Sequence, residues 1–130
     1  MDAGRHPLIE VITNAQITGC EGSPGDFTVT VRKNPRYVSE EKCVACGLCV
    51  DHCPQVGGNE FDMGLSSRKA IYIPFPQAVP STYTLDADRC LNANLDSPTG
   101  FRVLACNKCD EVCKPQCIDF DMKPEIIERE

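Results

Sequence analysis

Apolar and polar positions alternate most clearly near the two ends of the chain. Residues 27–33 (Phe-Thr-Val-Thr-Val-Arg-Lys) alternate along their length, which predicts a strand with one buried face. Residues 8–13 are rich in β-branched apolar side chains and also predict a strand, and a shorter strand is expected at about residues 15–19. Gly, Ser, Pro and Asp predict a turn over residues 21–26. Residues 8–33 therefore predict a small β-meander.

The middle of the chain predicts short strands separated by irregular segments. Residues 68–73 (Arg-Lys-Ala-Ile-Tyr-Ile) and 81–85 (Ser-Thr-Tyr-Thr-Leu) are expected to be strands. Residues 56–67 hold three glycines and are expected to be mostly loop. Three prolines within residues 74–80 favour an extended, irregular connection.

A last alternating segment, residues 125–130, has no evident partner among the cysteine-rich residues before it. The simplest arrangement pairs it antiparallel with residues 27–33. The two ends of an inserted domain normally lie close together, and neighbouring antiparallel strands would meet that condition. We therefore expect a flanking sheet from residues 1–35 and 124–130 and an inserted domain from residues 36–123.

Composition and charge narrow the possible chemistry. No run of about 18 apolar residues is present, so no membrane insertion is expected. The first residues lack the apolar core of a secretion signal. A net charge of −6 disfavours nucleic acid as a partner. The chain has ten cysteines. Because they are closely spaced and no secretion signal precedes them, they indicate metal binding in a reducing compartment rather than disulfides. We therefore expect a cytoplasmic protein.

The first run of cysteines has a specific spacing. Cys43, Cys46, Cys49 and Cys53 are followed by Pro54 in the pattern C-x2-C-x2-C-x3-C-P, which resembles that of bacterial two-cluster ferredoxins. Three closely spaced thiolates can hold one [4Fe–4S] cluster, whereas the fourth cysteine of such a run ligates the other cluster. The first run therefore predicts a second.

The second run is less regular. Its members are Cys90, Cys106, Cys109 and Cys113. Cys106, Cys109 and Cys113 repeat the x2 and x3 spacings of the last three cysteines of the first run. Acidic and basic residues precede Cys90, as they precede Cys43. Residues 91–105 form a long insertion. Their Asn, Asp, Ser, Pro and Gly residues, Asn92 among them, predict a surface loop.

Exchanging the fourth cysteines gives two predicted clusters. The first is assigned to Cys43, Cys46, Cys49 and Cys113, and the second to Cys53, Cys90, Cys106 and Cys109. A competing register uses Cys106, Cys109, Cys113 and Cys117. In that register three residues separate its second and third cysteines, Cys109 and Cys113, where the template has two. It also leaves Cys90 without a role. Under the favoured register Cys117 is a small buried residue beside a cluster, at the start of a strand, and Cys20 is a bystander in a Gly-rich turn.

Other interpretations stay open. A zinc-binding structural module also uses C-x2-C pairs, although it leaves the compact four-cysteine run unexplained. A single-cluster variant follows from the irregular second run, and a pure interaction module follows if the clusters serve only to fold the chain. His52 could tune a potential with pH, but an exposed helical histidine is the simpler expectation. No acid–base or nucleophile–base set is evident, so we expect an electron relay without a substrate site of its own.

Several segments resemble the A subunit of heterodisulfide reductase. They are residues 36–38, 43–54, 68–80 and 106–121. The resemblance implies an α+β fold in which a ferredoxin-like domain with two [4Fe–4S] clusters is inserted into the β-meander of a flavoprotein's FAD domain. It also implies cytoplasmic electron transfer between that FAD and other subunits of a heterodisulfide reductase-like or related redox complex, including flavin-based electron bifurcation in methanogens.

One expected feature of such a flavoprotein is missing. No G-x-G-x-x-G follows a strand and opens a helix, and the spacing of Gly19, Gly22 and Gly25 differs from that motif. We therefore expect this chain to be a segment of a longer subunit. By itself, the segment should bind no flavin.

Overall fold

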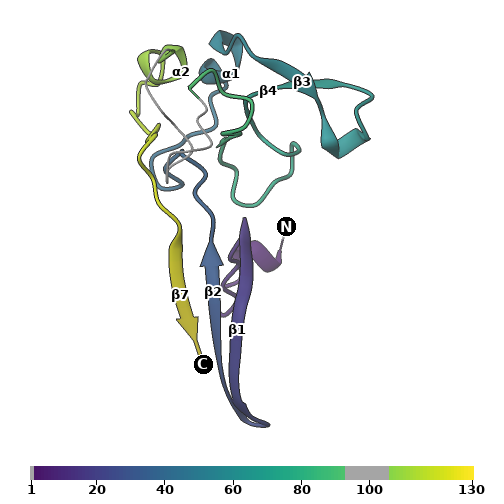
Figure 1. Ribbon diagram of the computed structural model, residues 1–130, viewed down its shortest axis with the longest axis vertical. Coiled ribbons are helices and arrows are strands. Elements are labelled where there is room, and N and C mark those ends of the chain that lie inside the picture. The colour runs from purple at the N-terminus through teal and green to yellow at the C-terminus, as the bar shows by residue number, and fades with distance from the viewer. Residues whose placement is uncertain (1, 93–105) are drawn as a thin grey trace. The chain divides into compact units, whose positions relative to one another are not determined.

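The computed structural model describes residues 2–92 and 106–130 (Figure 1). The chain divides into two compact units, Met1–Pro35 with Met122–Glu130, and Arg36–Asp121. Short helices and small antiparallel sheets make up the described residues, so the expected α+β class is confirmed at this level. None of the helices in this part of the chain is long and apolar enough to cross a membrane.

The first unit is a three-stranded antiparallel sheet in the order β1-β2-β7. These strands are β1 (Ala15–Ser23), β2 (Asp26–Lys33) and β7 (Glu125–Arg129) (Figure 1). Val31 pairs with Ile17 on one side and with Ile127 on the other, so a row of apolar side chains crosses one face of the sheet. The predicted antiparallel pairing of the strand at residues 27–33 with the C-terminal strand is confirmed.

Two expectations for this unit were wrong. Residues 8–13 form no strand, and Leu8 is 89% exposed. Strand propensity reflects packing against neighbours more than an intrinsic backbone preference, and this segment has no strand partner among the described residues. The strand expected to stop at residue 19 continues to Ser23, because the hairpin turn needs only Pro24 and Gly25. Cys20 therefore lies in β1 and not in a turn.

The second unit is built from very short elements. They are α1 (Leu48–His52), β3 (Val56–Gly58), η2 (Glu60–Asp62), β4 (Ser67–Lys69), β5 (Ile71–Tyr72), β6 (Thr84–Leu85) and α2 (Lys108–Glu111). A 3-10 turn, η1 (Ala3–Arg5), belongs to the first unit. Strand β3 pairs with β4, and β5 pairs with β6, both antiparallel. Helices α1 and α2 pack against each other.

The core of the second unit surrounds Ile71, which is fully buried and pairs with Leu85 across β5 and β6. Val38 is also buried and forms an isolated antiparallel bridge with Ile118. On either side of this bridge, the Ser39 N–H donates to the Cys117 carbonyl over 2.7 Å, and the Asp119 N–H donates to the Tyr37 carbonyl over 2.9 Å. The two ends of the unit are thus joined by main-chain hydrogen bonds.

The strands of this unit are shorter than the sequence predicts. The segment at residues 68–73 breaks at Ala70, because its two halves pair with different partners, β3 and β6. The buried Ala70 peptide instead donates to Gln55 and accepts from Asp86. Only Thr84–Leu85 of the strand expected at residues 81–85 forms, and the strand expected after Cys117 is reduced to the bridge at Ile118. Conversely, part of the loop expected at residues 56–67 forms β3.

Candidate metal centres

Two cavities of nearly equal size lie in the second unit and are lined by cysteines. The first has an empty volume of about 320 Å³ and is lined by Cys43, Cys46, Cys49, Cys113 and Cys117. The second has an empty volume of about 310 Å³ and is lined by Cys53, Cys90, Cys106 and Cys109. The four cysteines assigned to each predicted cluster therefore share a cavity, whereas the four cysteines of the competing register divide between the two.

The division of the cysteines into two sets rests on which cavity each cysteine lines. Among the described residues, no three or more His, Cys, Asp or Glu side chains converge closely enough to hold a single metal ion. Cys20 lies outside both cavities, exposed on β1 in the first unit.

The loop around the first cavity presents main-chain donors. Ala45 and Gly47 adopt left-handed conformations, with φ of 54° and 84°. Within the described part of the chain, the N–H groups of residues 44–49 donate to no protein carbonyl or side-chain oxygen. Successive N–H groups in such a loop form a concave, anion-binding surface of the kind that surrounds iron–sulfur clusters. The loop and its thiols therefore fit a [4Fe–4S] cluster.

Helix α1 separates two cysteines that face different cavities. Cys49 is buried within the helix and lines the first cavity, whereas Cys53 follows the helix in an extended conformation and lines the second. Pro54 also lines the second cavity. His52 is exposed, as expected, and its Nδ1 lies 2.9 Å from the Leu48 carbonyl oxygen.

Asn92 holds Cys106 at the second cavity. Its amide nitrogen donates to the Cys106 carbonyl over 2.6 Å, and its amide oxygen accepts from the Cys106 N–H over 2.9 Å. The expectation that Asn92 belongs to a surface loop was wrong, because this side chain is only 2% exposed. An amide carries both a donor and an acceptor and can replace a neighbouring strand as a partner. The rest of the predicted loop, residues 93–105, lies outside the described residues.

A turn from Asp86 positions Cys90. The N–H groups of Arg89 and Cys90 both donate to the Asp86 carbonyl, over 3.2 and 3.1 Å, and the Asp86 N–H donates to the buried Ala70 carbonyl over 2.7 Å. The start of the second run is thereby fixed to the core beside β5.

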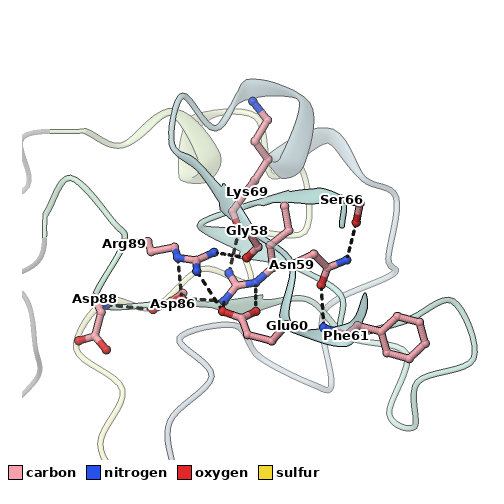
Figure 2. A network of polar contacts seen from close by, with 10 residues as sticks. Gly58, Asn59, Glu60, Phe61, Ser66, Lys69, Asp86, Asp88 and Arg89 are labelled. Carbon is pink, nitrogen blue, oxygen red and sulfur yellow. Dashed lines mark hydrogen bonds and ion pairs between the residues drawn. The ribbon is translucent and has the colours of Figure 1, made fainter. Parts of the chain in front are cut away.

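Arginine side chains tie this turn to the β3–β4 hairpin (Figure 2). Arg68 donates to both carboxylate oxygens of Glu60 and to Asp86, over 2.7, 3.0 and 2.8 Å. Arg89 donates to the Gly58 carbonyl over 2.8 Å and to Glu60 over 3.0 Å. These hydrogen bonds, chiefly that from Arg68, lower the pKa of Glu60 to about 2, so this carboxylate stays charged over the neutral range.

Burial strongly raises the pKa of several cavity thiols, among them Cys49 and Cys109. It raises the pKa of Cys49 to about 11 and that of Cys109 to about 12. Neighbouring cysteines contribute in the same direction. For Cys49 they are Cys43, Cys113 and Cys46, and for Cys109 they are Cys90, Cys53 and Cys49. These thiols are protonated at neutral pH without metal, so metal ligation must release protons.

Comparison with known proteins finds one family match and several similar proteins. Residues 36–56 match the family described as "4Fe-4S binding domain". The chain is 44% identical, over 98% of its length, to the iron–sulfur A subunit of CoB–CoM heterodisulfide reductase from Methanocaldococcus jannaschii. It is 43% identical, over its full length, to the A subunit of H(2):CoB-CoM heterodisulfide,ferredoxin reductase from Methanothermobacter marburgensis. The chain is homologous to a segment of the heterodisulfide reductase A subunit.

The chain covers only a small part of these heterodisulfide reductase relatives. It spans 17% of the length of the Methanocaldococcus protein and 18% of the length of the Methanothermobacter protein. The 4Fe–4S match contains all four cysteines of the first run and supports [4Fe–4S] binding, but the second run lies beyond it.

Proposed function

We propose that this chain transfers electrons through two [4Fe–4S] clusters as part of a heterodisulfide reductase A-like oxidoreductase subunit. One observation carries the proposal: each cavity is lined by three cysteines of one run together with the last cysteine of the other. This is the exchange of fourth ligands that two-cluster ferredoxins use. The first cluster is assigned to Cys43, Cys46, Cys49 and Cys113, and the second to Cys53, Cys90, Cys106 and Cys109.

Bound clusters of this type supply one-electron transfer at a potential set by charge, hydrogen bonds to sulfur and solvent exposure. The chain controls these factors at the first cavity. The N–H groups of residues 44–49 are available as donors, and Val38, Leu48 and Ile118 provide an apolar lining. The Tyr83 side chain also lines this cavity. The apolar residues beside Tyr83 limit the contact of the cavity with water.

The packing of α1 against α2 supports transfer between the two sites. Cys49 on α1 and Cys109 on α2 line different cavities, and the two helices that carry them are in contact. Electrons passing between the clusters would cross this helix pair without leaving the second unit.

We assign the first unit to the β-meander of an FAD domain in the full-length subunit. On the face that carries the apolar row, Ile17 is 71% accessible, as expected for a sheet that needs a further covering layer. The relay would then run between that FAD and other subunits of a cytoplasmic heterodisulfide reductase-like complex.

The first test is to measure iron and acid-labile sulfide in anaerobically prepared chain, with EPR after dithionite reduction. We expect about eight iron and eight sulfide per chain and spin-coupled signals. About four of each would mean a single cluster, and zinc without sulfide would mean a structural metal module. Either result would refute the two-cluster relay.

Paired substitutions test the exchange of fourth ligands. Cys53→Ala and Cys106→Ala should each make one cluster lose iron on oxidation, and the double variant should affect no second cluster, because both residues are assigned to the second site. Adding Cys46→Ala to Cys53→Ala should make both clusters lose iron, although both residues belong to the first run. Cys20→Ala, an exposed cysteine on β1, is the matched control and should keep the full iron content. Additive losses in the first pair would contradict the assignment.

A further inference from the structure

The first cavity holds one cysteine more than a four-thiolate cluster uses. Cys117 lines it together with the four assigned ligands and is only 5% exposed. Its sulfur lies 3.1 Å from the sulfur of Cys113, and its thiol also hydrogen-bonds with Cys43. The second cavity has no such additional cysteine among its described lining residues.

The backbone fixes both sulfurs at this position. The Gln116 N–H donates to the Cys113 carbonyl over 3.0 Å, and Gln116 has a φ of 51°, so the chain from Cys113 to Cys117 forms a tight turn. The Ser39 N–H then holds the Cys117 carbonyl over 2.7 Å. With the main chain held at both cysteines, the separation between the two thiols is within the range of a side-chain rotation.

We propose that Cys113 and Cys117 are interchangeable fourth ligands of the first cluster. This inference rests on the proposed function. In the exchange, the iron–sulfur bond to Cys113 breaks and one to Cys117 forms, while the proton of the Cys117 thiol passes to the Cys113 sulfur across their 3.1 Å contact. No electron is gained or lost, and the charge of the site is unchanged.

The Cys117 N–H favours one of the two states. It points at the Cys113 sulfur over 3.4 Å, and a hydrogen bond to a thiolate stabilises its charged form. Cys113 is therefore the resting ligand, and Cys117 takes over when Cys113 is removed.

The test compares Cys113→Ala, Cys117→Ala, the double variant and Cys46→Ala by iron content and EPR before and after mild ferricyanide oxidation. An iron without a thiolate ligand is the one lost on oxidation, leaving a three-iron cluster. We expect both single variants at the paired cysteines to keep about eight iron and to show no three-iron signal. The double variant and Cys46→Ala, a control whose side chain is exposed, should lose iron and show that signal.

Three outcomes would overturn the inference. In the first, Cys113→Ala behaves like Cys46→Ala, so that Cys117 cannot replace Cys113. In the second, Cys117→Ala alone loses iron, so that Cys117 is the sole ligand. In the third, the double variant keeps all its iron. Cys113→Val, whose side chain has no ligand atom, provides a second variant if the alanine chain does not fold. A failure of the proposed function is distinguishable, because the unsubstituted chain would then lack the first cluster.

Discussion

A single buried amide takes the place of a strand at the second cavity. Asn92 hydrogen-bonds to both polar groups of the Cys106 main chain. These bonds fix Cys106 close to Cys90 even though fifteen residues separate them in sequence. At the scale of one residue, Asn92 compensates for the irregular spacing of the second run.

Asn92→Ala should therefore weaken the second site. Losing the amide leaves the Cys106 peptide without these partners, at a cost of about 1–3 kcal/mol. We expect faster loss of one cluster's iron to a chelator, followed as absorbance decay, with the other cluster unaffected. Asn107→Ala is the matched control, because Asn107 neighbours Cys106 but its side chain makes no capping hydrogen bond. Equal rates in the two variants would contradict this role.

The elements of the second unit are too short to be stable alone. Helix α1 has five residues and α2 has four, well below the length at which isolated helices form in water. Strands β3 and β4 have three residues each, and an isolated hairpin is marginal in water. The hairpin is instead held by Arg68, whose guanidinium also lies 3.7 Å from the centre of the Tyr72 ring.

Arg68→Met keeps most of the side-chain volume and removes the bonds to Glu60 and Asp86. We expect amide hydrogen exchange in residues 56–69 to accelerate by roughly tenfold, the effect of about one lost charge-assisted hydrogen bond. Arg32→Met, on an exposed position of β2, is the control and should leave that exchange unchanged. Unaltered exchange in the Arg68 variant would show that the hairpin does not depend on the network.

Acid should have a similar local effect on this hairpin. Because the pKa of Glu60 is lowered from 4.5 to about 2, its contribution is complete above about pH 4.5 and is lost as the pH falls toward 2. Hydrogen exchange in residues 56–69, measured across this pH range and corrected for the intrinsic exchange rate, checks the expectation. The Arg68→Met chain should show a weaker pH dependence, because only the hydrogen bond from Arg89 to Glu60 remains.

Cysteine spacing and strand alternation are local signals, and they predicted the cysteine runs and several of the strands. The distant pairing of β2 with β7 was also predicted, because the alternating C-terminal segment had no other evident partner. The break at Ala70 did not, because it depends on which distant strands pair with each half. The burial of Asn92 also depends on a contact across the insertion. Spacing alone likewise cannot place the Cys117 sulfur beside that of Cys113.

At the scale of the whole molecule, the two units have separate roles. Every residue lining the two cysteine cavities belongs to Arg36–Asp121. The first unit contributes a sheet and one exposed cysteine.

A chain of residues 36–121 alone should therefore keep both clusters. We expect its iron and sulfide content and its EPR spectrum to equal those of the full chain, because the main-chain bridge between Val38 and Ile118 lies inside this unit. The same fragment carrying Cys46→Ala should lose iron on oxidation and show the three-iron signal, as expected for the full chain with that substitution. A fragment with less iron than the full chain would mean that the flanking sheet is needed to form the sites.

The bridge between Val38 and Ile118 also has a practical meaning for protein engineering. Main-chain hydrogen bonds join the beginning of the unit to its end, so the chain enters and leaves the unit at neighbouring positions. It can be grafted in place of a surface hairpin turn without stretching the recipient backbone. Such a graft would add both cysteine-lined sites to a host protein as one contiguous segment.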